Sequence, residues 1–336
     1  MSQLNVVLRS LPGRMRAVVL VALLAWVWAP GQVLASEAKY NLKIGGTTIG
    51  GAFYPVAAAI GQVLNQKSTR FNVTVQTTGG AGANIRLVDQ GEIDVGLSVT
   101  PISYYAFNGL GTWEKKYPVR SLMTFFPNAM TFITLESSNI KSIADLKGKK
   151  ITAGGPGAQW EAFMEPILSL YNMSFKDFSR VLYMGQEAAG NALKDGVVDA
   201  VFLGGGNPNI APTPALASLE STHKMRLLLP TENMLDQLKE KHPFLDKIKV
   251  RGGVYKAQPQ DAIWPDTGSM HLVVSPKADP EMIYQLVKAI YEHREEIART
   301  NPLARDISPD RVAIKTRIPY HEGAIRYYRE IKVWKE

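Results

Sequence analysis

The sequence of 336 residues contains no cysteine. This absence excludes disulfides, zinc sites built on thiolates, iron–sulfur clusters and a cysteine nucleophile. It fits export to a bacterial periplasm, where proteins either form disulfides or avoid thiols. We expect no metal site, because the histidines lie far apart, at positions 223, 242, 271, 293 and 321. We also expect no cofactor.

Long hydrophobic runs are also missing after the N-terminus, so no later segment has the roughly 20 apolar residues of a membrane span. At the N-terminus, three arginines precede the apolar run 17–29, and small residues fit a signal-peptidase site ending at Ala35. The pattern predicts a signal peptide over 1–35, cleaved near Ala35, and a periplasmic protein. An uncleaved N-terminal anchor is the alternative.

The length predicts two lobes, and the charge distribution does not indicate a nucleic-acid-binding protein. The mature part, about 300 residues, exceeds the usual size of one compact core, so we expect two lobes. The formal charge of +8 includes the three arginines of the leader. Elsewhere basic residues alternate with acids, as in 239–242 and 292–296, which is typical of solvated helices. We therefore expect no nucleic-acid partner.

The most distinctive stretch is the glycine-rich loop in residues 44–55, IGGTTIGGAFYP, between an apolar strand and a small-residue helix expected over 56–64. Glycines let the backbone approach a ligand, and the free N–H groups and dipole of a helix start favour an anion. The segment lacks the P-loop Lys-Ser/Thr pair and the G-x-G-x-x-G order, so we expect no nucleotide. The plain alternative is a tight turn.

The succession of strand, loop and helix recurs along the chain. Apolar runs at 71–77 and 93–97 each lead into a loop of small residues and then a helix. A pattern in 87–94 is echoed in 193–199, where again a helix ends at glycine and an aspartate opens a strand. These features predict an α/β protein with largely parallel, doubly wound sheets and with its ligand loops at the carboxyl ends of the strands.

The domain division is expected at Pro127-Asn128, which separates the apolar runs 122–126 and 130–135 in the manner of a strand that crosses between lobes. We assign lobe I to 40–126 plus 268–336, and lobe II to 127–267. Within them we expect a capped short helix after Ser142, a helical, charged segment over 213–249 and a strand over 269–274. A long amphipathic helix is expected over 280–300, and a terminal helix over 318–332 that packs on lobe I.

The loops expected at the strand ends contain no Lys, Arg, Asp, Glu or His; they are 45–54, 77–84, 98–103, 153–160 and 204–209. Acid–base catalysis needs a titratable group, and a metal site needs carboxylates or imidazoles. The sequence therefore predicts binding without catalysis. The groups present suit an anionic head with an aromatic wall beside it, and they also admit a neutral polar ligand.

The candidate ligand-binding residues supply backbone N–H, hydroxyl, amide and aromatic groups and one cation. They are Thr47, Thr48, Phe53, Tyr54, Thr78, Gly79, Gly80, Asn84, Arg86, Ser98, Thr100, Gly155, Pro156, Gly157, Gln159, Trp160 and Asn207. Arg86 is the nearest cation and suits a carboxylate; an exposed arginine or a salt bridge is its alternative role. We expect the ring of Trp160 in the pocket, because no core partner for it is evident nearby.

An ordered set of segments carries a family resemblance over essentially the whole mature chain. The segments are Gly45-Gly46 through Gly51-Ala-Phe-Tyr-Pro55, Thr78-Gly-Gly-Ala, Asn84-Ile-Arg86-Leu, Gly91-Glu-Ile-Asp-Val-Gly-Leu-Ser98, Tyr105-Ala-Phe-Asn108-Gly, Ser142-Ile-Ala-Asp-Leu-Lys-Gly-Lys149, Gly154-Gly-Pro-Gly157, Leu193-Lys-Asp-Gly196, Asn207-Pro-Asn209 and His321-Glu-Gly-Ala-Ile-Arg-Tyr-Tyr328. Together they resemble the TAXI family, the extracytoplasmic solute receptors of tripartite ATP-independent periplasmic (TRAP) transporters.

The resemblance implies a type II periplasmic binding protein, with two α/β lobes joined by crossing strands and closing on a ligand. Known members are associated with glutamate, glutamine and other small carboxylates, which they deliver to the membrane subunits of a TRAP transporter. We expect a monomer that binds a carboxylate, amino acid or keto acid. The alternatives are a solute sensor that feeds a signalling partner and an enzyme on the same fold.

Overall fold

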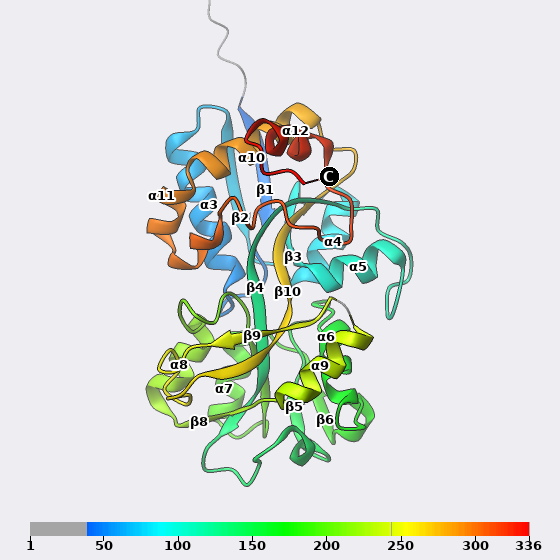
Figure 1. Ribbon diagram of the computed structural model, residues 1–336, viewed down its shortest axis with the longest axis vertical. Helices are drawn as coiled ribbons and strands as arrows, with labels where there is room; N and C mark the ends of the chain where they lie inside the picture. Colours follow the sequence, from blue (N-terminus) through cyan, green and yellow to red (C-terminus); the bar gives the residue numbers. More distant parts are fainter. Residues whose placement is uncertain (1–38, 243, 336) are drawn as a thin grey trace, which may run out of the picture. The chain divides into compact units, whose positions relative to one another are not determined.

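The computed structural model describes residues 39–242 and 244–335 (Figure 1). The predicted signal peptide over 1–35 lies outside the described residues. Among those residues, no helix is long and apolar enough to cross a membrane. Nor do three or more His, Asp or Glu side chains of the described chain gather closely enough to hold a metal ion.

The first lobe is built on three parallel strands in the order β2-β1-β3, each followed by a helix. The strands are β1 (Tyr40–Gly45), β2 (Phe71–Gln76) and β3 (Val95–Val99), and the helices are α3 (Phe53–Lys67), α4 (Ala81–Gln90) and α5 (Thr100–Asn108). Alternation in β2 places Phe71 and Val73 in the core and leaves Asn72 exposed. The parallel order with a helix after each strand confirms the sequence expectation here.

Two long strands, β4 (Arg120–Leu135) and β10 (Ala262–Val274), run through both lobes (Figure 1). They pair antiparallel with each other, and β10 also pairs antiparallel with β3. Pro127 and Asn128 lie inside β4, so the two apolar runs around them form one continuous strand, as predicted. The register of β10 against β4 shifts between Asp266 and Ser269. This irregular stretch is where the chain passes between the lobes.

The second lobe has parallel strands β5 (Lys150–Thr152) and β6 (Arg180–Leu182), while β7 (Val201–Gly204) and β8 (Met225–Leu228) pair antiparallel with β4. Strand β9 (Asp246–Val250) pairs with β10. The remaining elements are η1 (Ile143–Leu146), α6 (Glu161–Ser169), η2 (Phe175–Asp177), α7 (Gln186–Lys194), α8 (Pro214–Thr222) and α9 (Glu232–Lys241). The capped turn at Ser142 is confirmed as η1. The sheets are more mixed than the sequence indicated, because both crossing strands run antiparallel to their neighbours.

The expectation of a wholly helical segment over 213–249 was wrong, because β8 and β9 are strands in that range. Both are short, with four and five residues, and so short a run shows too little periodicity to separate a strand from a helix. Each is fixed instead by its partner, since β8 pairs with the edge of β4 and β9 with β10.

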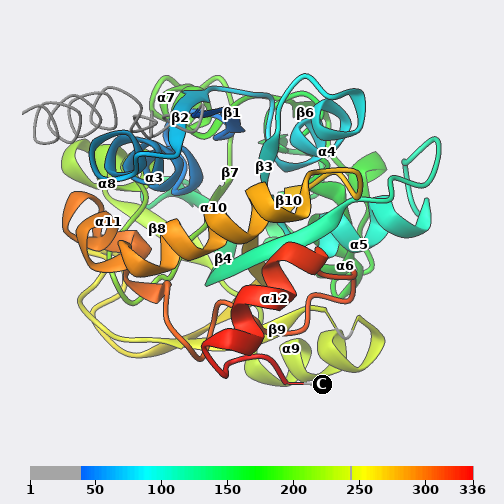
Figure 2. The ribbon, with the colours of Figure 1, turned by 90° about the horizontal axis from the view of Figure 1, so that it is seen from above.

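The C-terminal part returns to the first lobe, where α10 (Pro280–Glu292) and α12 (Glu322–Glu330) lie side by side (Figure 2). The helix expected over 280–300 breaks at His293, whose φ of −95° and ψ of 15° leave the helical range. It continues as α11 (Arg294–Thr300), and η3 (Pro302–Asp306) follows. Helix α12 is shorter than predicted but packs on the first lobe as expected, because the Tyr328 hydroxyl donates to the Leu122 carbonyl over 3.0 Å.

A buried polar cluster joins the crossing strands to α5. Nε2 of His271, on β10, lies 2.7 Å from the hydroxyl of Ser103, and its Nδ1 lies 3.1 Å from the hydroxyl of Ser121 on β4. Ser103 also donates to the hydroxyl of Ser98 over 2.9 Å. Desolvation lowers the pKa of His271 to about 3. The imidazole is therefore neutral at neutral pH and serves as a hydrogen-bonding link between strands.

Candidate functional site

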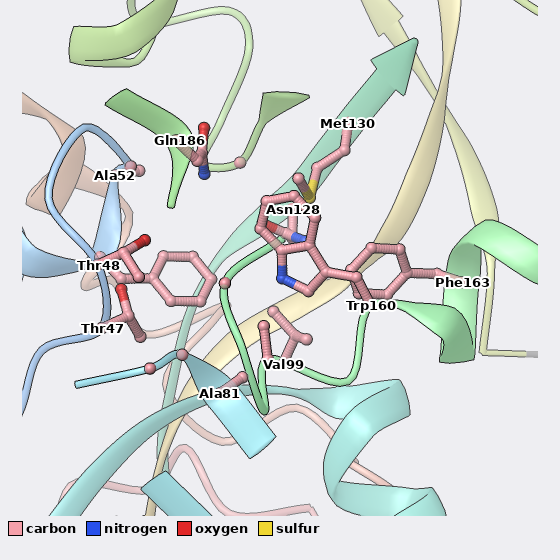
Figure 3. A pocket seen from close by; sticks show the side chains of 17 residues that line it. Thr47, Thr48, Ala52, Ala81, Val99, Asn128, Met130, Trp160, Phe163 and Gln186 are labelled. Carbon is pink, nitrogen blue, oxygen red and sulfur yellow. The ribbon is translucent and has the colours of Figure 1, made fainter. Parts of the chain in front are cut away.

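A cavity lies where the glycine-rich loops of the two lobes meet (Figure 3). It is lined by 17 residues, none of them charged: Thr47, Thr48, Gly51, Ala52, Phe53, Gly79, Gly80, Ala81, Val99, Asn128, Met130, Gly155, Ala158, Trp160, Phe163, Gln186 and Gly205. The free space within it is about 30 Å³. Pockets for drug-sized ligands reach several hundred Å³, on the order of 300–1,000. A ligand of more than a few heavy atoms therefore needs a wider cavity than this structure shows.

Five helices begin at this cavity. The residue before the first helical residue lines it in four of them, and the first residue lines it in the fifth; they are Ala52 of α3, Gly80 of α4, Val99 of α5, Trp160 of α6 and Gln186 of α7. None of the four residues before a helix makes a side-chain cap hydrogen bond. Helix N-termini present N–H donors and the positive ends of helix dipoles. The cavity wall thus contains the starts of five helices and no cationic side chain.

Glycines let the two lobes approach backbone to backbone beside the cavity. A Cβ on Gly79 would lie 2.5 Å from the carbonyl oxygen of Pro156, and a Cβ on Gly80 would lie 2.8 Å from the Cβ of Ala158. The N–H of Gly82 donates to the carbonyl of Ala158 over 3.3 Å. These contacts join the two lobes directly, so they belong to a closed conformation. A side chain in place of either glycine would hold the lobes apart.

The loop of residues 47–51 closes a second side of the cavity. Its Gly50 carbonyl accepts a hydrogen bond of 3.0 Å from the N–H of Ala215 in α8. A Cβ on Gly50 would lie 2.6 Å from the backbone nitrogen of Glu187 in α7. Thr47 adopts a φ of +75°, and Gly50 one of +91°, so the loop folds tightly over the second lobe.

Trp160 forms an aromatic wall and also has the core partners that the sequence did not reveal. Its ring centroid lies 6.1 Å from those of Phe163 and Phe202. The ring lies against Gly154, where a Cβ would approach it to 2.6 Å and where φ is +70°. Side-chain packing therefore fixes one part of the indole while another part faces the cavity (Figure 3).

The sequence analysis did not identify Asn128 and Gln186, the two side-chain amides of the cavity wall. Asn128 is 2% exposed and Gln186 7% exposed. Nδ2 of Asn128 lies 2.8 Å from the hydroxyl of Thr267 on β10, and Nε2 of Gln186 donates to the carbonyl of Gly204 over 2.9 Å. Gln186 follows a glycine at a helix start, which is a local signal for a ligand loop. Asn128 lies in an apolar strand, where its neighbours in the sequence do not indicate that it lines a cavity.

The structure brings part of the predicted set together around the cavity: Thr47, Thr48, Phe53, Gly79, Gly80, Gly155 and Trp160. The others support the loops or lie elsewhere. Pro156 and Gly157 place their carbonyl oxygens against Gly79 and Gly82, Tyr54 packs on Gly46, and Gln159 accepts a hydrogen bond of 2.5 Å from Thr112. The hydroxyl of Thr78 is buried and makes no hydrogen bond to the described residues.

Several predicted polar residues hold the scaffold instead of lining the cavity. Asn84 is fully buried and donates to the carbonyls of Gly45 and Leu97 over 3.0 and 2.8 Å, which ties the end of β1 to the middle of β3. Ser98 belongs to the His271 cluster. Thr100 accepts from the N–H of Ser269 over 3.1 Å, and Asn207 donates to Asp306 over 2.9 Å.

Arg86 is not among the residues that line the cavity. Its guanidinium pairs with Glu114 at 3.4 Å and lies 4.4 Å from the ring centroid of Trp113. This partner carboxylate accepts hydrogen bonds from Tyr117 and Arg86, which lower the pKa of Glu114 to about 2. The salt bridge, which was the alternative role for this arginine, is what the structure shows.

Comparison with known proteins places these features in a family. The model of the NMT1-like family matches residues 44–331. A protein from Bordetella bronchiseptica RB50 has a similar solved structure, with a TM-score of 0.56 and 15% identity over 88% of this chain and 99% of that chain. A binding protein component of an ABC phosphonate transporter from Pseudomonas aeruginosa is also similar, with a TM-score of 0.54 and 12% identity over 79% of each chain. At these identities the two structures show a shared fold, which is that of periplasmic binding proteins. The chain belongs to the NMT1-like family.

Proposed function

We propose that this protein is an extracytoplasmic solute receptor that binds a small organic acid between its two lobes. The observation that carries the proposal is the convergence of five helix N-termini on one uncharged cavity. Such N–H groups and dipoles stabilise an anionic head. The apolar part of the ligand then contacts Trp160 and Phe163.

Closure about the crossing strands supplies the signal that a receptor transmits. The ligand docks on the loops of one lobe, and the other lobe then completes the site through the glycine contacts described above. We place the lobes at 40–126 with 268–336 and at 127–267, because β4 and β10 both cross at these boundaries. We propose that the protein acts as a monomer.

Binding without catalysis is favoured because the cavity wall contains no titratable side chain. A general acid, a general base or an activated nucleophile has to reach the substrate. The lining hydroxyls belong to Thr47 and Thr48, and no base is among the residues that share the cavity with them. Turnover of any candidate acid by the purified protein would contradict this assignment.

We propose export to the periplasm and delivery of the ligand to the membrane subunits of a TRAP transporter. The resemblance of the ordered segments to those of TAXI receptors supports this partner. An ABC transporter is the alternative partner, because the similar protein from Pseudomonas aeruginosa is described as part of an ABC transporter. Neighbouring genes separate the two: a multi-span permease without an ATPase favours TRAP, whereas an adjacent ATPase gene contradicts it.

A thermal-shift screen of the ligand-stripped mature protein tests the proposed function. The panel contains small monocarboxylates and dicarboxylates, hydroxy acids, keto acids, amino acids and neutral sugars. A ligand at about 100 times its Kd stabilises the folded state by about 2.7 kcal/mol, which raises Tm by degrees. We expect a hit among the acids. A hit confined to neutral compounds would contradict the proposal.

Replacing Trp160 with Ala should weaken binding of that acid about tenfold, because the indole is a wall of the cavity and supplies much of its apolar contact. Trp160→Phe, the matched control, should retain most of the affinity, because it keeps a ring against Gly154. Isothermal titration measures both, and circular dichroism checks the fold. Equal affinities for Trp160→Ala and the wild type would remove Trp160 from the site.

A further inference from the structure

Asn128 presents its side-chain oxygen to the cavity, and neighbouring hydrogen bonds fix that orientation. The residue lies on β4 where the strand passes between the lobes, and Figure 3 shows it among the side chains that line the cavity. Its Nδ2 lies 2.8 Å from Oγ1 of Thr267 on β10. Thr267 is itself fully buried. The two residues thus form a buried, hydrogen-bonded contact between the crossing strands.

The hydroxyl of Thr267 decides which end of the amide faces the ligand. A threonine hydroxyl has one hydrogen, and Thr267 donates it to the backbone carbonyl of Asn128. Its oxygen can then only accept from the Asn128 side chain, so the NH₂ group faces Thr267. The opposite end, Oδ1, faces Gly205, where a Cβ would lie 3.0 Å from it. Since Gly205 lines the cavity, the wall carries a fixed hydrogen-bond acceptor.

Gln186 supplies the opposite polarity in the same wall. Its Nε2 donates to the carbonyl of Gly204 over 2.9 Å, and its Oε1 accepts from the N–H of Gly204 at 3.4 Å. Because a carbonyl only accepts, this amide is also fixed. The second hydrogen of Nε2 is left over, and a Cβ on Gly51, another lining residue, would lie 2.9 Å from that nitrogen. The wall therefore sets an oriented donor beside an oriented acceptor.

We propose that Oδ1 of Asn128 selects a ligand that carries a hydroxyl group next to its acid group, so that the receptor prefers 2-hydroxy acids. This rests on the proposed function, the binding of a small organic acid. The helix N-termini and Gln186 donate to the acid group, whereas Oδ1 repels a keto or carboxylate oxygen and needs a donor.

A hydroxyl fits this acceptor better than an ammonium group does. An ammonium would also donate to Oδ1, but its positive charge would be buried beside five helix N-termini. None of the lining residues has a carboxylate to balance it. The site therefore discriminates against amino acids as well as against keto acids.

Titration calorimetry with matched acids tests the inference. One series is lactate, pyruvate, propionate and alanine; the second is malate, oxaloacetate, succinate and aspartate, and the series with the better-binding carbon skeleton is used. We expect the hydroxy acid to bind about tenfold or more tightly than its keto and unsubstituted analogues. The preference should disappear in Asn128→Leu, which keeps the branched shape of the side chain and removes the acceptor.

The variant Thr267→Val tests whether the preference depends on the orientation of the Asn128 amide or only on its packing. Without the hydroxyl, the Asn128 amide is free to turn its NH₂ group into the cavity, so affinity for the keto acid should rise while that for the hydroxy acid falls. A lost contact alone would weaken both. The exposed Asn72→Ala variant on β2 is the control and should bind as the wild type does.

The outcomes distinguish this inference from the proposed function. Equal binding of the hydroxy and keto acids by the wild type, or preference for the amino acid, would overturn the role of Asn128 while the receptor assignment stands. An unchanged preference in both Asn128→Leu and Thr267→Val would do the same. Failure of every acid in the larger screen would instead overturn the proposed function. Should Asn128→Leu not fold, Thr267→Val carries the test alone.

Discussion

Gly79→Ala should fold normally and lose ligand affinity by about tenfold to a hundredfold. The added methyl carbon would lie 2.5 Å from the carbonyl oxygen of Pro156 in the opposite lobe. Backbone cannot yield as a flexible side chain can, so the lobes have to stop short of full closure. Overpacking of this kind costs roughly 1–3 kcal/mol. Because the clash exists only in the closed form, the cost falls on binding and not on folding.

Gly190→Ala is the matched control for this variant. Gly190 lies within α7, and an added Cβ would have the carbonyl of Ala215 as its nearest neighbour at 3.7 Å, an ordinary contact. This alanine should leave affinity unchanged and, since alanine favours a helix, should raise Tm slightly. Calorimetry and small-angle scattering with and without ligand measure affinity and closure. Wild-type affinity in Gly79→Ala would show that this contact does not form in the bound state.

Local features of the chain were sufficient to predict the glycine loops and the crossing strand. The loops follow directly on strands, where glycines allow a close backbone approach, so Gly79, Gly80 and Gly155 were predicted as ligand-binding residues, and the structure brings them to one cavity. Pro127-Asn128 interrupts a long apolar run, which indicated the crossing point. In each case the signal and its structural consequence lie within a few residues of each other.

The residues that were missed or misplaced depend on partners distant in the sequence. Asn128 acquires its orientation from Thr267, which is 139 residues away. Arg86 was expected near an anion, but Glu114 and Trp113, which follow the next helix, take up its charge. Strands β8 and β9 are defined by the edges against which they pair. Sequence reasoning supplied the chemistry of the loops, whereas long-range contacts decide which of those groups reach the ligand.

Acidification from pH 7 to pH 5 should cost the protein about 2 kcal/mol of stability through His271 alone. Burial lowers the pKa of His271 to about 3 from 6.5. Below pH 6.5 the imidazole is therefore protonated in the unfolded chain, whereas in the folded chain it stays neutral until the pH approaches 3. Stability from this group is complete above pH 6.5 and is lost progressively as pH falls toward 3. His271→Gln should be less stable overall, yet its free energy of unfolding should fall about 2 kcal/mol less over this range.

Asp266 on β10 should contribute a pH dependence of stability with the opposite sign to that of His271. A variant of Asp266 is therefore an internal control for the experiment. Burial raises the pKa of Asp266 to about 6, against hydrogen bonds from Gly268 and Asn128; Asp246 raises it further and Arg311 lowers it. Its contribution is therefore complete below pH 3.8 and is lost as pH rises through 6. Asp266→Asn should increase the loss between pH 7 and 5 by about 1 kcal/mol. Urea titrations at both pH values measure these differences, and variants that shift the pH dependence in the same direction would contradict both assignments.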